Sequence, residues 1–121
     1  MFQVIFNSIS ASEISQLGTV EQLDLLAKFQ VSPEQLDNLD GEHFGKIERD
    51  GKALYRYRLD DHRIYFSLDG GNVIVHRVLN RNSFSDFLFR STNLPVAEDE
   101  ALGESGHFWE LIQEGQNAKR L

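Results

Sequence analysis

One short segment of the chain, residues 54–66, alternates between apolar and polar side chains with a period of two. This period is typical of a β-hairpin, because successive side chains of a strand point to opposite faces of the sheet. With a turn at residues 60–61, one face carries Arg56, Arg58, Arg63 and Tyr65. Arginines that oppose each other across a ladder repel and weaken the sheet. We therefore expect these guanidinium groups to serve an anion, such as phosphate, whose oxygens fit the planar donor fork of arginine.

A second hairpin extends this polar face. Residues 69–72, Asp-Gly-Gly-Asn, predict a tight turn, because glycines supply the positive φ values that a type I′ turn needs. The turn places His76 opposite Tyr65, and so adds an imidazole to the arginine face. It also places Arg77 opposite Ile64 on the apolar face, where the arginine must reach out to solvent or lie near a strand end. Four antiparallel strands are predicted, at residues 44–49, 53–59, 62–68 and 73–79.

The elements ahead of this sheet are predicted to cover its apolar face. Apolar periodicity indicates a short strand followed by two helices, at residues 2–6, 11–17 and 20–30. Capping-box spacing supports helix starts at Ser10 and Thr19, and Ser32 marks the start of a third, short helix. We expect a solvated acidic helical face made of Glu13, Glu21, Asp24, Glu34 and Asp37.

Residues 91–121 differ in composition from the rest of the chain. Residues 96–106 are acidic and lack periodicity, which indicates a solvated linker. Residues 108–112, Phe-Trp-Glu-Leu-Ile, are apolar enough to dock as a short amphipathic helix on their own domain or on a partner. A further hypothesis is that an acidic segment masks the arginines: Glu98, Asp99, Glu100 and Glu104. Such a mask requires close docking, because physiological salt screens charges beyond about 8–10 Å.

Composition narrows the class of protein. A length of 121 residues fits one domain, and the absence of cysteine excludes disulfides, thiolate catalysis and cysteine-ligated metals. No metal-ligand motif is present, so we expect neither a metal nor a cofactor. We expect no signal peptide, and no apolar run approaches the roughly 18 residues of a membrane span. A cytoplasmic protein is the resulting expectation.

The charge of the chain is unevenly distributed. The net charge is −7, yet residues 45–90 contain nine basic side chains against six acidic ones. Residues 1–44 contain one basic side chain against seven acidic ones, and residues 91–121 contain two against six. A bound polyanion responds to local potential more than to the total, so the basic middle is compatible with nucleic acid. The alternative is that ordinary charged residues fall unevenly by chance.

The order of the predicted elements and three short motifs resemble a known family. The motifs are Leu-Tyr-Arg-Tyr-Arg-Leu at residues 54–59, Asp-His-Arg-Ile-Tyr-Phe at 61–66, and Val-Ile-Val-His-Arg-Val-Leu-Asn-Arg at 73–81. Together with the N-terminal strand and helical hairpin, they resemble the RelE/ParE superfamily of bacterial toxin-antitoxin toxins. The resemblance implies an α+β fold over residues 1–90, in which the N-terminal strand and helical hairpin pack on an antiparallel sheet. Residues 91–121 would then be an acidic linker with a short C-terminal helix.

The RelE-like branch implies a metal-independent endoribonuclease that cleaves ribosome-bound message and inhibits translation. In that mechanism the 2′-hydroxyl attacks the neighbouring phosphate, which requires a base, an acid and cations near the phosphorane. The resemblance assigns charge stabilisation to Arg63 and Arg81, and backbone phosphates to Arg56 and Arg58. For proton transfer it leaves Tyr65 and His76 as candidates. Phe84 and Phe87 can stack a base but cannot carry a proton.

Two other functions fit the same pattern. One is a ParE-like gyrase inhibitor, and the other is a catalytically degenerate toxin-fold protein that only binds. The resemblance also implies a small antitoxin protein as partner, in addition to the ribosome and its message, and no membrane. Oligomeric state cannot be predicted from this chain.

Overall fold

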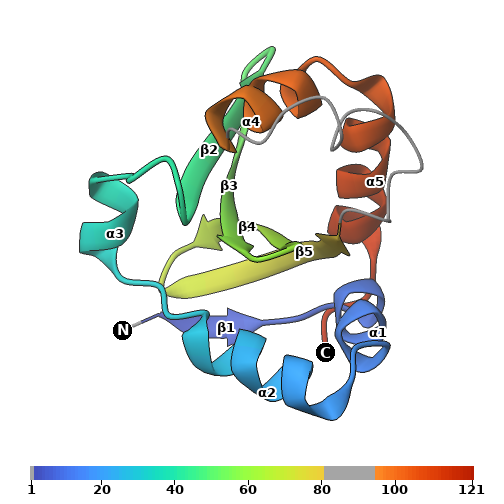
Figure 1. Cartoon of the computed structure of the whole chain (residues 1–121). Helices are drawn as coiled ribbons and strands as arrows, with labels where there is room; N and C mark the ends of the chain where they lie inside the picture. The colour runs from blue at the N-terminus through green and yellow to red at the C-terminus, as the bar shows by residue number, and fades with distance from the viewer. Residues whose placement is uncertain (1, 81–94) are drawn as a thin grey trace.

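The computed structural model describes residues 2–80 and 95–121, and has a mixed α+β fold (Figure 1). The strands in these ranges are β1 (Gln3–Ile5), β2 (Phe44–Arg49), β3 (Lys52–Leu59), β4 (His62–Asp69) and β5 (Asn72–Asn80). The helices are α1 (Ser8–Ser15), α2 (Thr19–Lys28), α3 (Pro33–Asp37), α4 (Pro95–Gly103) and α5 (Gly106–Asn117). No helix in the described ranges is long and apolar enough to cross a lipid bilayer.

The strands form one sheet in the order β1-β5-β4-β3-β2, with β1 parallel to β5 and the other neighbours antiparallel. The four predicted antiparallel strands are confirmed to within one residue at each end. In the β3–β4 hairpin, Arg56 is paired with Tyr65 and Arg58 with Arg63, as predicted. The turns contain Asp60 and Gly70 at φ values of 53° and 62°, a left-handed conformation that aspartate tolerates and glycine favours.

The pairing of β4 with β5 departs from the prediction at a β-bulge. A register shift between Tyr65 and Phe66 leaves His76 as an extra residue, so that Tyr65 is paired with Arg77. Ile64 consequently faces Val78, and two apolar side chains meet on the core face. The predicted partners of Tyr65 and Arg77 were wrong because a strict two-residue period cannot show an inserted residue.

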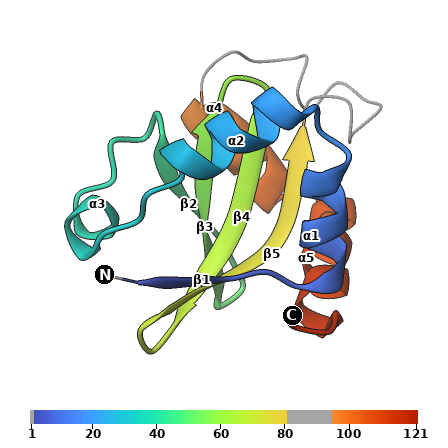
Figure 2. The same cartoon turned by 90° about the horizontal axis from the view of Figure 1, so that it is seen from below.

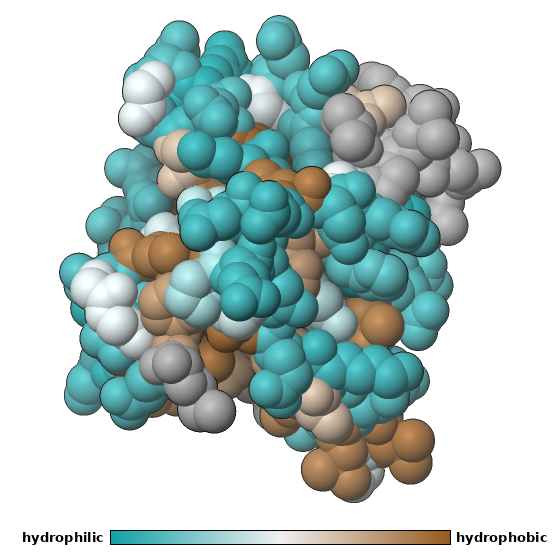
Figure 3. All heavy atoms as spheres, turned by 90° about the vertical axis from the view of Figure 1, so that its left-hand side faces the viewer, coloured by the Kyte–Doolittle hydropathy of each residue, from teal (hydrophilic) through white to brown (hydrophobic). Residues whose placement is uncertain are grey.

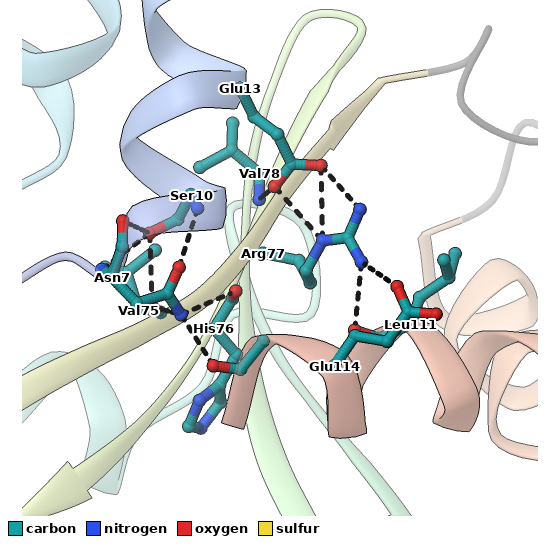
Figure 4. Close-up of polar contacts among 10 residues, drawn as sticks. Asn7, Ser10, Glu13, Val75, His76, Arg77, Val78, Leu111 and Glu114 are labelled. Carbon is teal, nitrogen blue, oxygen red and sulfur yellow. Dashed lines mark hydrogen bonds and ion pairs between the residues drawn. The ribbon is translucent and has the colours of Figure 1, made fainter. Parts of the chain in front are cut away.

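Asn7 satisfies the backbone of this bulge (Figure 4). Its Nδ2 donates to the carbonyl oxygens of Val75 and His76, both at 3.1 Å, and to that of Gly115 in α5 at 2.8 Å. One buried amide therefore joins the start of α1, the bulge of β5 and the end of α5. A buried backbone carbonyl without such a donor would be costly, so Asn7 stabilises the bulge.

Arg77 joins the same three elements from the other side of the strand (Figure 4). Its Nε and Nη2 donate to the carboxylate of Glu13 in α1, at 2.9–3.2 Å. Its Nη1 donates to the carbonyl of Leu111 and to the carboxylate of Glu114, both in α5. The expectation that Glu13 is solvated was therefore wrong, because this carboxylate pairs with an arginine that the bulge turns toward α1.

The helix starts differ from the prediction by a few residues. α1 begins at Ser8, and Asn7 rather than Ser10 is its cap; Ser10 completes the capping box as the third helical residue. α2 begins at Thr19 after Gly18, which offers no side-chain cap. The capping box at Ser32 is confirmed for α3.

The N-terminal helices cover one face of the sheet, as predicted. The buried cluster on this face, the first core, contains Ile14, Leu25, Phe29, Leu36, Phe44, Tyr57, Ile64, Phe66, Val73, Val75 and Val78. Seen from below, α2 crosses in front of β3 and β4, while α4 lies behind them (Figure 2).

The opposite face is also covered, and Glu98 and Asp99 contact the arginines there as the masking hypothesis requires, although no helix was predicted for them. Residues 95–103, expected to be a linker, form α4, and α5 packs on its own sheet as one of the two predicted alternatives. The second core contains Ile47, Leu54, Tyr65, Leu79, Leu102, Phe108 and Ile112. The arginine face is therefore the buried floor beneath α4 and α5. The guanidinium groups expected to meet an external anion, which requires exposure to solvent, are closed off by the protein's own carboxylates.

We predict that Gly115→Ala lowers the stability of the protein. α5 approaches β5 so closely that a Cβ at this position would overlap the carbonyl of His76. Overpacking of this kind costs about 1–3 kcal/mol, which urea unfolding followed by circular dichroism can measure. Gly106→Ala in the same helix is the matched control, because a Cβ there meets no described atom within 4 Å. Equal midpoints for the two variants would contradict the observed docking of α5.

Candidate anion-binding site

Arg56 of β3 lies fully buried beneath α4, and all five of its N–H donors are used. Nη1 donates to the carbonyls of Glu42 and His43 at 2.8 and 3.1 Å, and Nη2 donates to that of Gly41 at 3.1 Å. Nε and Nη2 donate to the two carboxylate oxygens of Asp99 at 3.0 and 2.7 Å. The guanidinium group therefore joins the loop before β2 to α4.

Arg63 of β4 is bound in a similar way, by backbone carbonyls on one side and by a carboxylate of α4 on the other. Nη1 donates to the carbonyls of Asp60 and His62 in the β3–β4 turn, at 2.7 and 3.1 Å. Nε and Nη2 donate to the carboxylate of Glu98 at 2.9 and 3.3 Å. Glu98 and Asp99, which are adjacent in α4, thus bind the guanidinium groups of two arginines on neighbouring strands.

Both arginines use their groups in the same way. Nη1 binds backbone carbonyls next to the strand, which fixes the guanidinium plane from the side of the sheet. The remaining edge, Nε with Nη2, binds one oxyanion through two parallel N–H donors. Gly45 of β2 leaves the necessary space, since a Cβ there would overlap both Arg56 and the carboxylate of Asp99.

The two ion pairs are almost completely removed from water. The exposed fractions are 0% for Arg56, 1% for Arg63, 2% for Glu98 and 7% for Asp99. Burial raises the pKa of the Asp99 carboxyl, and the hydrogen bonds and charge of Arg56 offset only part of that rise. Desolvation of this kind cancels much of the attraction in a buried ion pair, so these contacts fix geometry more than they add stability.

Tyr65 lies on the same face but is enclosed by apolar side chains. Its ring is fully buried and packs edge-on against Phe108 of α5, with the ring centroids 5.0 Å apart. The hydroxyl has no hydrogen-bond partner among the described residues. Burial, followed by the charge of Glu98, raises the pKa of Tyr65 well above its usual value. In this closed arrangement the phenol cannot act as a base near neutral pH.

His76, in the bulge of β5, is neutral at physiological pH. Its Nε2 lies 2.7 Å from the hydroxyl of Ser67, and the residue is 5% exposed. Burial, with a smaller contribution from the charge of Arg120, lowers the pKa of His76 to about 4. At pH 7 an imidazole with this pKa is not present as the imidazolium that a general acid requires, and it is a weak base.

The structure brings together only part of the predicted site. Arg56 and Arg63 meet under α4, and Arg58 is half-buried opposite Arg63, with its charge near Asp99. Three other predicted residues lie outside the described part of the chain: Arg81, Phe84 and Phe87.

Neither α4 nor the second core follows from the periodicity of the sequence. The segment that carries Glu98 and Asp99 has little apolar periodicity, which favours a solvated linker over a docked helix. The available signal was on the arginine face itself, where Ile47, Leu54 and Leu79 share the side of the sheet with the arginines. Such apolar positions need a cover, and only the C-terminal segment remained to supply one.

A hollow of about 410 Å³ adjoins the ion pairs between the edge strand β2 and α4. Its lining includes Gly45, Lys46, Arg49 and Asp99. The face of the molecule that carries α3 and this edge is mostly hydrophilic, with scattered apolar patches (Figure 3). Within residues 2–80 and 95–121, no group of three or more His, Asp or Glu side chains is arranged to hold a metal ion.

Comparisons of this chain with protein-family models, with curated proteins and with solved structures gave no match. The α+β class and the five-stranded sheet are properties of the structure itself. The relation to the RelE/ParE superfamily stays a prediction from the sequence motifs.

We predict strong coupling between Arg63 and Glu98 in a double-mutant cycle. Arg63→Met or Glu98→Leu alone leaves an uncompensated buried charge, which costs about 3–5 kcal/mol, whereas the double variant loses less than either single one. Urea unfolding of the four proteins gives the coupling energy. The exposed pair of Lys28 and Asp24, with its 3.2 Å contact, is the control, and Asp24→Asn should change stability by less than about 1 kcal/mol. Additive effects at Arg63 and Glu98 would contradict the buried pair.

We predict that acidification destabilises the protein through His76. The pKa is about 4 in the folded chain, against 6.5 for an unperturbed histidine, so below pH 6.5 the unfolded chain binds a proton that the folded chain excludes. Stability attributable to this group is complete above pH 6.5 and falls by on the order of 3 kcal/mol toward pH 4. His76→Gln should remove this part of the pH dependence, while His107→Gln at an exposed position should retain it. Parallel pH profiles for wild type and His76→Gln would refute the shift.

Proposed function

We propose that this protein is a RelE/ParE-like toxin that inhibits translation by binding RNA through Arg56 and Arg63. The observation that supports the proposal is the pair of guanidinium groups, each fixed by backbone carbonyls and each with its Nε–Nη2 edge turned to an oxyanion. Arginine binds carboxylate and phosphate through the same two parallel donors. Glu98 and Asp99 therefore occupy the positions that phosphate oxygens of RNA would take.

The identity of the ligand rests on charge and on the resemblance. Residues 45–90 are the basic part of an acidic chain, and they contain both arginines. A phosphate backbone, with one charge on every nucleotide, suits two neighbouring cations better than an isolated anion does. The RelE-like motifs narrow the ligand to message on the ribosome, in the cytoplasm, with an antitoxin as the controlling partner.

Binding without efficient cleavage is the activity that the site favours. Phosphodiester cleavage by a 2′-hydroxyl needs groups that accept and donate protons near neutral pH. Burial raises the pKa of Tyr65 and lowers that of His76, so neither is suited to this task in the closed form. A ribonuclease remains the second candidate, favoured by the position of Arg63 on the same sheet face as both of these side chains.

The salt dependence of RNA binding tests the proposal. The test measures binding of a short single-stranded RNA to the full-length Glu98→Gln/Asp99→Asn variant by fluorescence anisotropy. These substitutions remove the carboxylates from both guanidinium forks. Two phosphate contacts predict that log K falls with log salt at a slope of about −1.4. Arg63→Lys in this background keeps the charge but loses the fork, so we expect weaker binding.

Translation in an extract separates the two candidates. If the protein only binds, the Glu98→Gln/Asp99→Asn variant slows translation while the message stays intact, and adding Tyr65→Phe changes nothing. Cleaved message that disappears with Tyr65→Phe would instead establish the ribonuclease. Absence of both RNA binding and inhibition would refute the proposed function.

A further inference from the structure

We infer that α4 is a releasable plug, which closes the arginine pair by presenting two carboxylates in place of two RNA phosphate groups. The inference rests on the proposed function and describes how that site is regulated. When RNA displaces α4, Leu102 leaves the second core, while α5 stays docked on the sheet through Phe108 and Ile112. Binding of RNA and docking of α4 are therefore mutually exclusive.

The two C-terminal helices are attached to the sheet by different forces. Leu102 is the one fully buried apolar side chain among those described in α4. The main polar contacts of α4 with the sheet are made by Glu98 and Asp99. α5 instead buries Phe108 and Ile112 completely in the second core. The attachment of α4 is thus largely ionic, and that of α5 is largely apolar.

An ionic attachment of this kind can be exchanged for another oxyanion. Release of α4 returns Glu98 and Asp99 to water, which recovers the solvation that they lose on burial. A phosphate group then accepts the same Nε and Nη2 donors of Arg56 and Arg63, so no guanidinium donor is left without a partner. The backbone contacts of Nη1 do not involve α4, and they hold both forks in place during the exchange.

The joint between the two helices is held by contacts that do not depend on the ion pairs of Glu98 and Asp99. Arg49 of β2 donates to the carbonyl oxygens of Gly103 and Glu104, at 3.5 and 2.9 Å. Trp109 of α5 donates from its indole Nε1 to the carbonyl of Gly103 at 2.9 Å. These contacts fix the C-terminal end of α4 to β2 and α5. α4 therefore opens by swinging about residues 103–105, with its two carboxylates on the moving arm.

The hollow beside the ion pairs lies on the side from which the arginines become accessible when α4 leaves. It lies between β2 and α4, and both Lys46 and Arg49 line it next to Asp99. Glu48, Glu100 and Glu104 also line the hollow, so its carboxylates outnumber these two cations while α4 is docked. A phosphate chain therefore reaches Arg56 only when α4 moves and takes Asp99 and Glu100 away. The closed fraction of the protein sets the apparent affinity, because only the open form binds RNA.

A pair of charge-matched variants tests the plug. Glu98→Gln/Asp99→Asn removes the two carboxylates that contact the arginines. Glu110→Gln/Asp37→Asn removes the same two charges from exposed positions on α5 and α3. We expect the first variant to bind single-stranded RNA at least about tenfold more tightly than wild type, and the control to change by less than about twofold. Equal gains in both variants would mean that net charge alone is responsible, and would overturn the plug.

Hydrogen exchange of the wild-type chain provides a test that does not depend on how the variants fold. Saturating RNA should accelerate amide exchange in residues 95–103 and leave residues 108–115 unchanged. Tripolyphosphate is the second probe, because it offers the same phosphate oxygens without a nucleic acid. A ligand that binds while exchange in α4 stays the same or slows would overturn the inference.

The outcomes separate the plug from the proposed function. If tripolyphosphate opens α4 but RNA does not bind, the plug stands and the RNA-binding function fails. If RNA binds with α4 still protected from exchange, the function stands and the plug fails. If neither probe binds to wild type or to either variant, both are refuted.

Discussion

Two arginine–carboxylate pairs determine how one half of this molecule is built. A guanidinium group has five N–H donors and no acceptor, so it can be buried only where several oxygens surround it. Arg56 meets this condition with three backbone carbonyls and one bidentate carboxylate. Because the loop before β2 supplies only carbonyls, the face cannot close without acids from another element. α4 supplies these acids from adjacent positions, Glu98 and Asp99, and the second core forms around them.

The sheet consequently has two unlike faces. The first core is apolar throughout and needs only close packing against α1 and α2. The second face combines apolar side chains with buried charges, and its cover must match donors as well as shape. Asn7 and Arg77 link the two layers at the bulge of β5, where each binds both the N-terminal and the C-terminal parts of the chain. The position of α5 is therefore coupled to the start of α1.

The sequence was sufficient for the elements whose signal is local. Strand periodicity and the Gly70 turn correctly predicted the hairpins, the pairing of Arg58 with Arg63, and the apolar face that the N-terminal helices cover. The bulge at His76 was not predictable, because an inserted residue leaves the alternation intact on either side. α4 was missed because its docking depends on ion pairs 35 and 43 residues distant in sequence. Long-range pairing of this kind has no periodic pattern in a single chain.

The same contacts that close the site also argue for an exchangeable cover. If the face were only structural, apolar side chains of similar volume would hold α4 at least as firmly, because desolvation offsets most of the attraction between buried charges. The ion pairs specify the position of α4 but add little net free energy to its docking. Carboxylates are moreover the protein groups closest to phosphate in how they engage an arginine fork. A cover that offers the chemistry of the proposed ligand, on a helix with one fully buried apolar anchor among its described side chains, is suited to competition with that ligand.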